Sequence, residues 1–411
     1  MDMSANAHLV PVAAASLSAT ALQNASIERI LVSLREHLGT EVALVSRFTR
    51  NNEREIAYID SVIDIPMGPG FREPREDSYC WYVTEGRLPE MIQDPAKHPL
   101  TGEIAITSVL PVGCHFSTPL RLSDGTTYGS LCSFSRKPDP SLTVRDLAVF
   151  QGFAALVAEH IEAVVDNDYR RSRIDGRITK LIADKGLEIV QQPIHSVQTG
   201  KPVGVECLSR FPDAMMRSPD KWFDEAAEIG RGVELELLAI EAALASLDKI
   251  PDGCYISVNA SPDTIMSGRL ETMLEKVGKG DIVVEVTGHQ HARDMNALRA
   301  ALKPISKFAR IAIDDVGLDY ECLKHLVDLS PKLLKLDMEL TRDIHQDLAR
   351  CALVGAIVRF AEAIGSKLIA EGIEHAEEAA VLKRLGVEFG QGYLYAKPMP
   401  VADAVKHLKK G

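Results

Sequence analysis

Acidic, amide and lysine side chains recur at the ends of successive apolar runs in the second half of this chain. Each run is short and rich in aliphatic residues, as is typical of a buried β-strand. Helix-length segments separate most of the runs, so the strands are predicted to be mainly parallel, with their polar ends on one face. The polar residues, in chain order, are Glu206, Asn259, Glu285, Asp314, Asp315, Lys335, Glu371, Glu374 and Gln391.

Carboxylates gathered at one face of a sheet or barrel predict a metal site. Such acids would repel one another strongly unless cations held them together. The candidate ligands are carboxylate and amide oxygens, without a His or Cys pair at ligand spacing, and oxygen sites suit Mg²⁺ or Mn²⁺ better than Zn²⁺. Two ions about 3.5–4 Å apart can activate a water and offset charge on a departing oxygen, as hydrolysis of a phosphodiester requires. For each acid alone, a solvated loop charge is the simpler interpretation; the repetition favours a metal.

The first two predicted strands of this half must form a hairpin. Residues 187–194 and 202–210 are separated only by residues 195–201, a segment too short for a crossover helix. All later connections have room for a helix. Residues 178–411 are therefore predicted to fold as an α/β domain, a TIM-like (β/α)8 barrel with one antiparallel strand.

The first half is predicted to hold a smaller antiparallel α+β domain at residues 23–142. An Asp-Gly pair between two of its alternating runs is a strong hairpin signal. Between the first and second pair of runs lies a loop-rich segment at residues 66–110. The predicted helix and four strands lie at residues 27–37, 41–48, 55–62, 114–122 and 127–135.

The segment 80–135 resembles the GAF family of sensory domains, chiefly through the hairpin CHFSTPLRLSDGTTYGSLCSFS. The resemblance implies a regulatory sensor whose ligand the residues do not identify. Cys114-His115 is similar to the Cys-His pair of bilin-binding relatives, but here it falls inside a strand-like run. Two packed structural residues are therefore favoured over a bilin attachment or a haem ligand at His115.

Residues 143–177 are predicted to form a connecting helix and hinge. Thr143 and Asp146 have the spacing of a capping box. The apolar seam behind them fits two alternatives about equally: pairing with a second copy in a homodimer, or packing on its own domain. Charged residues at 166–177 indicate the hinge. The seam residues are Leu147, Phe150, Ala154, Val157, Ile161 and Val164.

Length and composition favour a soluble, cytoplasmic chain of two domains. The chain has 411 residues, of which 46% are hydrophobic, enough for two cores. A formal charge of −12 argues against a nucleic acid polymer or an anionic membrane as a partner. Seven scattered cysteines without a CxxC pair predict reduced, mostly buried thiols. No apolar run approaches membrane-spanning length, and residues 1–22 are interpreted as a flexible lead-in.

The second half resembles the EAL family of cyclic di-GMP phosphodiesterases over more than half of the chain. Where that family has Q-P-I, E-A-L-x-R, N-x-S and E-L-T-E, this chain has Gln192-Pro193-Ile194, Glu206-Cys207-Leu208-Ser209-Arg210, Asn259-Ala260-Ser261 and Glu285-Val286-Thr287-Gly288. Where it has D-D-F-G-T-G-Y, K-x-D, A-E-G-V-E and Q-G-Y, this chain has Asp314 to Tyr320, Lys335-Leu336-Asp337, Ala370-Glu371-Gly372-Ile373-Glu374 and Gln391-Gly392-Tyr393. Each motif is weak alone, but the ordered set is specific.

The resemblance implies hydrolysis of cyclic di-GMP to linear pGpG with two Mg²⁺ or Mn²⁺ ions, controlled by the sensor. The implied metal ligands are Glu206, Asn259, Glu285, Asp314, Asp315 and Glu374. Lys335 and Glu371 join Glu206 as the implied catalytic residues, although a salt bridge is the commoner fate of a barrel lysine. The implied substrate-binding residues are Gln192, Leu208, Arg210 and Gln391.

Two departures from the family pattern leave an alternative function open. Gly288 replaces the second Glu of E-L-T-E, and residues 316–324 differ from the usual loop, which weakens the expected anchoring of Asp315. A catalytically weak or inactive EAL domain that binds cyclic di-GMP as a signalling module is therefore the second hypothesis. A glycoside hydrolase is the third, because paired carboxylates serve there too, but neither Trp81 nor Trp222 lies on a predicted strand end.

Overall fold

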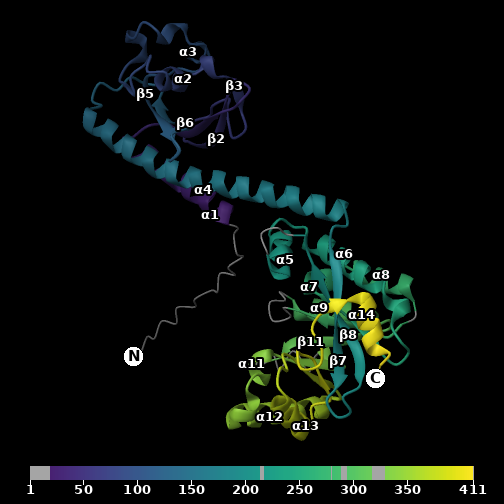
Figure 1. Cartoon of the computed structure of the whole chain (residues 1–411). Coiled ribbons are helices and arrows are strands. Elements are labelled where there is room, and N and C mark those ends of the chain that lie inside the picture. The colour runs from purple at the N-terminus through teal and green to yellow at the C-terminus, as the bar shows by residue number, and fades with distance from the viewer. Residues whose placement is uncertain (1–18, 213–216, 279, 288–293, 317–328, 411) are drawn as a thin grey trace, which may run out of the picture. The chain divides into compact units, whose positions relative to one another are not determined.

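The chain divides into two compact units, Met1–Arg171 and Ser172–Gly411 (Figure 1). The computed structural model describes residues 19–212, 217–278, 280–287, 294–316 and 329–410. Most of the predicted lead-in lies outside these residues, and helix α1 begins at Ala19, inside the segment 1–22 that was expected to be flexible.

The N-terminal unit is built on an antiparallel six-stranded sheet in the order β3-β2-β1-β6-β5-β4. Its strands are β1 (Val42–Phe48), β2 (Glu53–Ser61), β3 (Arg72–Pro74), β4 (Met91–Ile92), β5 (Cys114–Arg121) and β6 (Thr127–Ser135). Short helices occupy the predicted loop-rich middle: η1 (Arg75–Asp77), α2 (Tyr79–Thr84), η2 (Pro95–Lys97), η3 (Thr101–Glu103) and α3 (Ile106–Val109). The α+β prediction is confirmed, with four strands close to their predicted bounds.

Two helices, α1 (Ala19–Leu38) and α4 (Val144–Ala183), supply the core beside this sheet. The ring of Phe150 is fully buried and lies 5.2 Å from that of Phe116 on β5. Four residues of the predicted seam share this core, namely Phe150, Ala154, Val157 and Ile161. The structure therefore decides between the two alternatives for the seam: it packs on its own domain.

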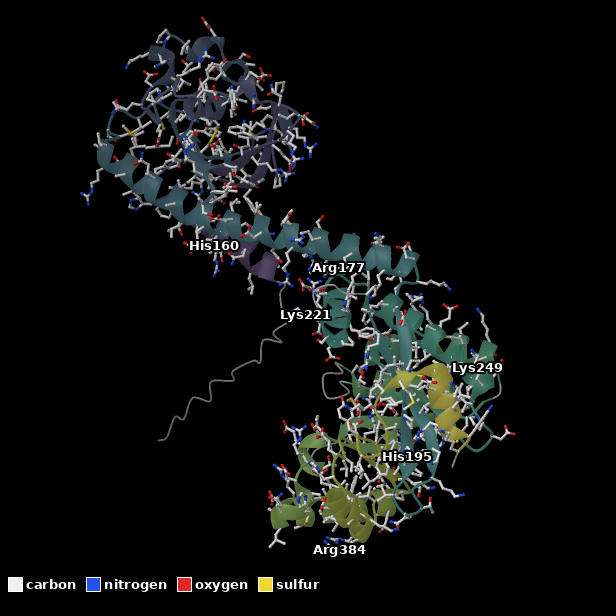
Figure 2. The ribbon with its side chains drawn as sticks, in the orientation of Figure 1. His160, Arg177, His195, Lys221, Lys249 and Arg384 are labelled. Carbon is white, nitrogen blue, oxygen red and sulfur yellow. A yellow bond between two sulfur atoms is a disulfide. The ribbon has the colours of Figure 1, made fainter. Side chains whose placement is uncertain are left out.

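Helix α4 runs unbroken through residues 166–177, where the sequence predicted a hinge. Further along, Ile174, Ile178 and Leu181 enter a core of the C-terminal unit. Arg177, which is labelled in Figure 2, forms an ion pair with Glu225, and its guanidinium lies 5.2 Å from the centre of the Trp222 ring. The charged segment is helical because its apolar positions have a packing surface, which charge content alone did not reveal.

By length and composition alone, α4 is also a helix that could cross a membrane. An 18-residue window has a mean hydropathy of 1.4, contrary to the expectation that no run approaches that length. A single helix of this kind is weak evidence, because core helices of globular proteins pass the same test. Part of its apolar face lies in the core of the N-terminal unit.

The C-terminal unit is a closed barrel in the order β14-β13-β12-β11-β10-β9-β8-β7, with β15 added beside β7. Strands β8 to β14 are parallel, whereas β7 pairs antiparallel with both β8 and β14. The predicted barrel with one reversed strand is confirmed. The strands are β7 (Glu188–Ser196), β8 (Pro202–Arg210), β9 (Tyr255–Ala260), β10 (Ile282–Val286), β11 (Arg310–Val316), β12 (Leu333–Leu336), β13 (Lys367–Ala370), β14 (Phe389–Gly390) and β15 (Met399–Pro400).

Helices cover the outside of the barrel, and a large apolar core lies between them and the strands. His195 on β7, which is labelled in Figure 2, lies near the barrel closure. Its imidazole stacks on the ring of Tyr395, with centres 4.9 Å apart, and hydrogen-bonds His407. The helices are α5 (Pro219–Glu228), α6 (Gly232–Leu244), η4 (Leu247–Lys249), α7 (Pro262–Met266), α8 (Arg269–Val277), α9 (Met295–Ile305), α11 (Met338–Thr341), η6 (Ile344–Gln346), α12 (Leu348–Ile364), α13 (Ala376–Leu385) and α14 (Val401–Leu408).

The cysteines differ from the prediction at one place. Cys80 on α2 and Cys132 on β6 form a disulfide, where reduced thiols were expected throughout. Cys114 and Cys207 are buried free thiols, and Cys254 and Cys351 are partly buried. The error arises because two cysteines 52 residues apart carry no local signal that they meet in space.

The position of Phe150 generates a prediction about stability and assembly. Phe150→Ala removes a fully buried ring, so we expect a loss of about 3–5 kcal/mol in the free energy of unfolding of the N-terminal unit. Leu156→Ala is the matched control, because this side chain on the same helix is 50% exposed, and a surface change costs within about 0.5 kcal/mol. Urea unfolding and sedimentation measure both quantities. Unchanged stability with dissociation of a dimer would show that the seam is intermolecular.

Candidate functional site

The candidate site is the second interior layer of the barrel. Strands alternate their side chains, so every second residue points inward. The first interior layer is an apolar plug formed by Ile194, Tyr255, Val283, Ala312, Leu333 and Ile369. On the parallel strands, the residue two positions after each plug residue is polar: Ser257, Glu285, Asp314, Lys335 and Glu371. Strand β7 runs in the opposite direction, so there the matching residue is Gln192, two positions before Ile194. The apolar plug thus supports a polar layer at the carboxyl ends of the parallel strands.

Glycine is required where the plug meets β8. A Cβ atom at Gly204 would lie 2.7 Å from the ring of Tyr255, closer than non-bonded carbon atoms approach. The missing side chain lets the Tyr255 ring fill the barrel interior. Glu206 follows two residues later and reaches the polar layer.

The ammonium of Lys335 lies at the centre of this layer and is surrounded by carboxylates. Its side chain is only 2% exposed, which makes its charge dependent on these partners. Lys335 Nζ lies 2.6 Å from Glu371 Oε1, 2.7 Å from Glu285 Oε2, and 3.4 Å from both Glu206 Oε1 and Asp314 Oδ1. Four acids predicted from separate strands are therefore brought together by one cation.

Amide and hydroxyl groups complete the network around Glu206 and Glu285. Gln391 Nε2 donates to Glu206 Oε2 at 2.7 Å and to Gln192 Oε1 at 3.0 Å. Asn259 Nδ2 donates to Glu206 Oε1 at 3.1 Å. The hydroxyl of Ser257 donates to Glu285. Ser257 was missed from the sequence, although its position two residues before Asn259 on the same strand places it in the same interior row.

Burial raises the pKa values of the carboxyl groups in the cluster, whereas the charge of Lys335 lowers them. Desolvation, reinforced by neighbouring acids and opposed by Lys335, raises the pKa of Glu285 to about 8. Desolvation likewise raises the pKa of Glu371 to about 7. At Glu206, desolvation is outweighed by Lys335 and two amide hydrogen bonds, so its pKa lies below the ordinary value. Desolvation opposes the charge of Lys335, but the surrounding carboxylates hold its pKa well above the ordinary value.

The arrangement fits a hard divalent cation. One ammonium faces four carboxyl groups, so the layer holds more potential negative than positive charge. Gln391 Oε1 is buried and has no hydrogen-bond partner within the described part of the chain. Such a layer of oxygen donors suits ions of the Mg²⁺ or Mn²⁺ class. The described oxygen donors around this layer are Glu206, Asn259, Glu285, Asp314, Glu371 and Gln391, and the first four are the ligands predicted from the sequence.

Several predicted site residues lie away from the Lys335 cluster, and others lie outside the described residues. The side chain of Glu374 is 44% exposed, and its carboxylate lies 4.0 Å from Arg342 Nη2, away from the contacts of Lys335. Arg210 is exposed at the end of β8 and donates to the carbonyl of Ser209 at 2.9 Å, while Leu208 is half-buried. The side chain of Asp315, Gly288 and residues 317–324 lie outside the described residues, so the predicted loop anchoring is untested.

Neither tryptophan offers a platform for a sugar at the barrel mouth. Trp222 is 3% exposed and stacks on Phe211, with ring centres 5.1 Å apart. Trp81 belongs to the N-terminal unit, where the guanidinium of Arg75 lies 3.7 Å from the ring centre. The glycoside hydrolase hypothesis has no support from these residues.

Comparison with known proteins identifies both halves. The EAL domain family model matches residues 175–398, and the GAF domain family model matches residues 24–161. The probable cyclic di-GMP phosphodiesterase PdeB of Escherichia coli K12 is 28% identical over 242 residues, covering 56% of this chain and 46% of PdeB. This chain spans less than half the length of that relative.

Solved structures resemble the barrel. The PaMucR phosphodiesterase in complex with c-di-GMP is 26% identical with a TM-score of 0.51, covering 56% of this chain and 99% of that one. An EAL domain protein from Listeria monocytogenes EGD-e is 22% identical with a TM-score of 0.51, covering 56% and 96%. The second likeness shows a shared fold.

The raised pKa of Glu285 predicts how the metal-free chain responds to pH. A carboxyl whose pKa is about 8 folded and 4.5 in its ordinary state binds its proton more tightly when folded. The stability that it contributes is therefore complete below pH 4.5 and is lost as pH rises through about 8. Glu285→Gln cannot ionise, so in excess chelator its thermal midpoint should exceed that of the wild type increasingly from pH 5 to pH 8.

Glu374→Gln is the matched control for this experiment, because its carboxylate lies outside the Lys335 cluster. We expect the same dependence on pH as in the wild type. A gap between Glu285→Gln and the wild type that stays constant or narrows as pH rises would contradict the assignment of the buried proton to Glu285.

Proposed function

The chain belongs to the EAL domain family over residues 175–398, and we propose that it hydrolyses cyclic di-GMP to linear pGpG with Mg²⁺ or Mn²⁺. The observation that carries this proposal is the convergence of four strand-end carboxyl groups on the buried Lys335. Relatives named as cyclic di-GMP phosphodiesterases support the substrate, as does the c-di-GMP complex of PaMucR.

Two sets of residues would hold the metal ions. Glu206, Asn259, Glu285 and Asp314 would bind the first, as supported by their shared layer. Asp314, Asp315 and Glu374 would bind the second, which requires Glu374 to turn from Arg342. When bound, such ions lower the pKa of a coordinated water and offset charge on the phosphate oxygens.

The chain's own residues would orient the water and the phosphate. Lys335 keeps its proton, because the carboxylates around it hold its pKa high, and its ammonium can hydrogen-bond the attacking water or a phosphate oxygen. Glu371 is the most exposed of the four acids, at 23%, and can accept a hydrogen bond from that water. The guanidinium of Arg210 offers two parallel donors to a phosphate of the substrate.

The amides Gln192 and Gln391 act from the other side of Glu206. Gln391 donates to both Glu206 and Gln192, and Gln192 donates to the carbonyl of Ala396 at 3.1 Å. These bonds fix the carboxylate of Glu206, and the amides themselves are buried, Gln192 at 8% and Gln391 at 4% exposure. Leu208, half-buried on the same strand, would give the substrate an apolar contact.

Regulation by the GAF-like unit is part of the proposal. One helix, α4, supplies side chains to a core of each unit, Phe150 and Val157 to one and Ile174 and Ile178 to the other. A change of packing in the sensor core would therefore act on a helix that the barrel unit also packs. The ligand of the sensor is not identified by these observations.

We also propose a cytoplasmic homodimer that binds neither a nucleic acid polymer nor a membrane. The charge of −12 supports the exclusion of polyanions. The seam does not support the dimer, because Phe150 and Ile161 are buried within their own unit. A dimer contact would use other exposed apolar side chains, such as Val109, which is 65% exposed.

Turnover should depend on a divalent ion and on Glu206. Incubation with cyclic di-GMP and Mg²⁺ or Mn²⁺ should give the linear product, and excess chelator should abolish it reversibly. Glu206→Ala should lower kcat by at least about 10²-fold, since an electrostatic contact to the reacting centre is lost. Glu241→Ala is the matched control, because this side chain is 60% exposed.

The measurement is chromatography of the dinucleotides, with calorimetric binding beside it. Full activity in chelator would contradict the metal-dependent reaction. Binding of cyclic di-GMP without any linear product would favour the signalling module instead.

Chemistry and binding should separate at Lys335. Lys335→Ala should lower kcat by about 10²–10³-fold, because a donor aimed at the water or phosphate is lost, and should raise KM by less than about tenfold. Lys406→Ala is the control, because this ammonium is 72% exposed. Circular dichroism checks that the variant is folded. A normal kcat with only a raised KM would make Lys335 a residue that positions the substrate.

A further inference from the structure

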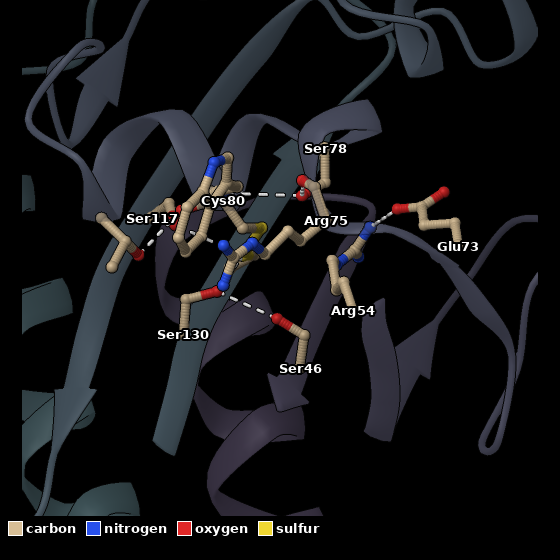
Figure 3. The surroundings of a disulfide bond; sticks show 11 residues. Ser46, Arg54, Glu73, Arg75, Ser78, Cys80, Ser117 and Ser130 are labelled. Carbon is tan, nitrogen blue, oxygen red and sulfur yellow. Dashed lines mark hydrogen bonds and ion pairs between the residues drawn. A yellow bond between two sulfur atoms is a disulfide. The ribbon is translucent and has the colours of Figure 1, made fainter. Parts of the chain in front are cut away.

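A second cluster of metal-ligating side chains lies in the N-terminal unit, apart from the barrel. One ligand atom each from Cys80, His115 and Cys132 lies within 4.8 Å of the others. The three side chains are almost fully buried, at 3%, 3% and 2% exposure. They come from three elements, α2, β5 and β6, and Figure 3 shows the surroundings of the two cysteines, which form a disulfide.

Local structure explains why these three side chains meet. Ser78 caps α2 by accepting a hydrogen bond from the backbone N–H of Trp81, which fixes the first turn that carries Cys80. Strand alternation puts His115 and Ser117 on one face of β5. Cys132 lies directly opposite Ser117 in the β5–β6 ladder. The cluster is therefore held by a helix cap and a strand register, and not by a flexible loop.

A small cavity adjoins the cluster. Its volume is about 30 Å³, and its lining includes Cys80, His115 and Cys132, the charged Arg54, and apolar side chains such as Leu44 and Phe134. The guanidinium of Arg54 forms an ion pair with Glu73, which offsets its charge beside the cluster. A space of this size accommodates one water or one metal ion. It does not accommodate a cyclic nucleotide or a haem.

The imidazole of His115 carries an unused ligand atom. Nδ1 is buried and has no hydrogen-bond partner among the described residues. An unpaired buried nitrogen costs free energy that a bound ion would recover. Desolvation, and to a lesser extent the charge of Arg54, lowers the pKa of His115 to about 3, so the ring is neutral and keeps a lone pair. The ring packs edge-on against Tyr79, with centres 5.1 Å apart, but within the described part of the chain the disulfide between Cys80 and Cys132 gives Nδ1 no partner.

We propose that Cys80, His115 and Cys132, once the disulfide is reduced, form a binding site for a divalent transition-metal ion of the zinc class. Reduction of the Cys80–Cys132 bond takes two electrons and two protons: a dithiol supplies them and becomes a disulfide, or a phosphine and water supply them and the phosphine becomes its oxide. The metal ion then displaces both thiol protons to solvent. Two thiolates, one imidazole and one open position make up the first coordination shell.

Charge favours this ligand set in an apolar interior. Two thiolates cancel the double charge of the ion, so the buried complex is neutral, whereas a bare divalent ion would be strongly destabilised there. The hydroxyls of Ser117 and Ser130 lie 3.4 and 3.3 Å from Cys132 Sγ and can donate to the thiolate. Ser130 is itself held by Ser46, with the two oxygens 3.0 Å apart (Figure 3). Such outer hydrogen bonds orient metal ligands.

The test uses the full chain, reduced with a phosphine without oxygen, freed of metal by a chelator, and titrated with Co²⁺ as the probe. We expect a thiolate-to-cobalt charge-transfer band that saturates at one equivalent and disappears when Zn²⁺ is added. The barrel site cannot produce this band, because its candidate ligands are oxygens. Cys80→Ser and Cys132→Ser should abolish the band, and His115→Ala should weaken Co²⁺ binding at least about 10–100-fold, the loss expected even for an outer-shell change.

Cys114→Ser is the matched control, since Cys114 is a buried free thiol next to His115 but is not in the cluster. It should keep the band. Alkylation of the reduced wild type provides a readout that does not depend on a variant folding: Zn²⁺ should protect Cys80 and Cys132 from modification, as mapped by mass spectrometry. Absence of the band and of this protection would leave a disulfide only and overturn the metal site. Equal loss of the band in Cys114→Ser would also overturn it.

Discussion

The structure of the barrel depends on one electrostatic constraint: four acids share a single buried ammonium. Lys335 lies within 3.4 Å of each carboxylate, in a layer where Glu285 is fully buried. A buried charge is stable only when it is paired, so Lys335 keeps its ammonium charge because of the carboxylates around it. The raised pKa values of Glu285 and Glu371, about 8 and about 7, show that one ammonium does not compensate all four. That deficit of positive charge is what makes the layer suitable for divalent cations.

The apolar plug below this layer is what makes the convergence geometrically precise. Val283, Leu333 and Ile369 fill the barrel interior from three strands, and each is followed two residues later by Glu285, Lys335 or Glu371. Because a packed core resists small displacements, the functional groups inherit their spacing from apolar contacts. The strand residues that point outward pack against the helices and form the large apolar core. The residues that point into the barrel are not needed for that core, so some of them can be polar.

In the N-terminal unit, packed elements likewise position the sulfur and imidazole groups of the proposed metal site. Its sheet and helix α2 hold Cys80, His115 and Cys132 in a buried pocket, and helix α4 closes a core on that sheet with Phe150 and Val157. The same helix continues to Ile178 in the core of the barrel unit. The helix therefore supplies residues to a core of each unit.

The sequence by itself determined the barrel, its reversed strand and the charged residues of the polar layer. Seven residues between two strands exclude a crossover helix, and repetition of acids at strand ends is visible without coordinates. Local pattern suffices there because strand alternation and connection length are local constraints. Glu206, Glu285, Asp314, Lys335 and Glu371 were all identified in this way, and their meeting follows from barrel closure.

Only the tertiary structure decided which partner each group takes. The seam of α4 fitted two packing partners equally, and the burial of Phe150 in its own unit chose between them. Residues 166–177, the predicted hinge, lie within one helix, and Ile174 and Ile178 of that helix pack in a core of the C-terminal unit. Glu374 follows a motif yet lies by Arg342, and Cys80 meets Cys132 across 52 residues. Each of these depends on contacts between segments distant in sequence, and such contacts leave no periodic trace in the chain.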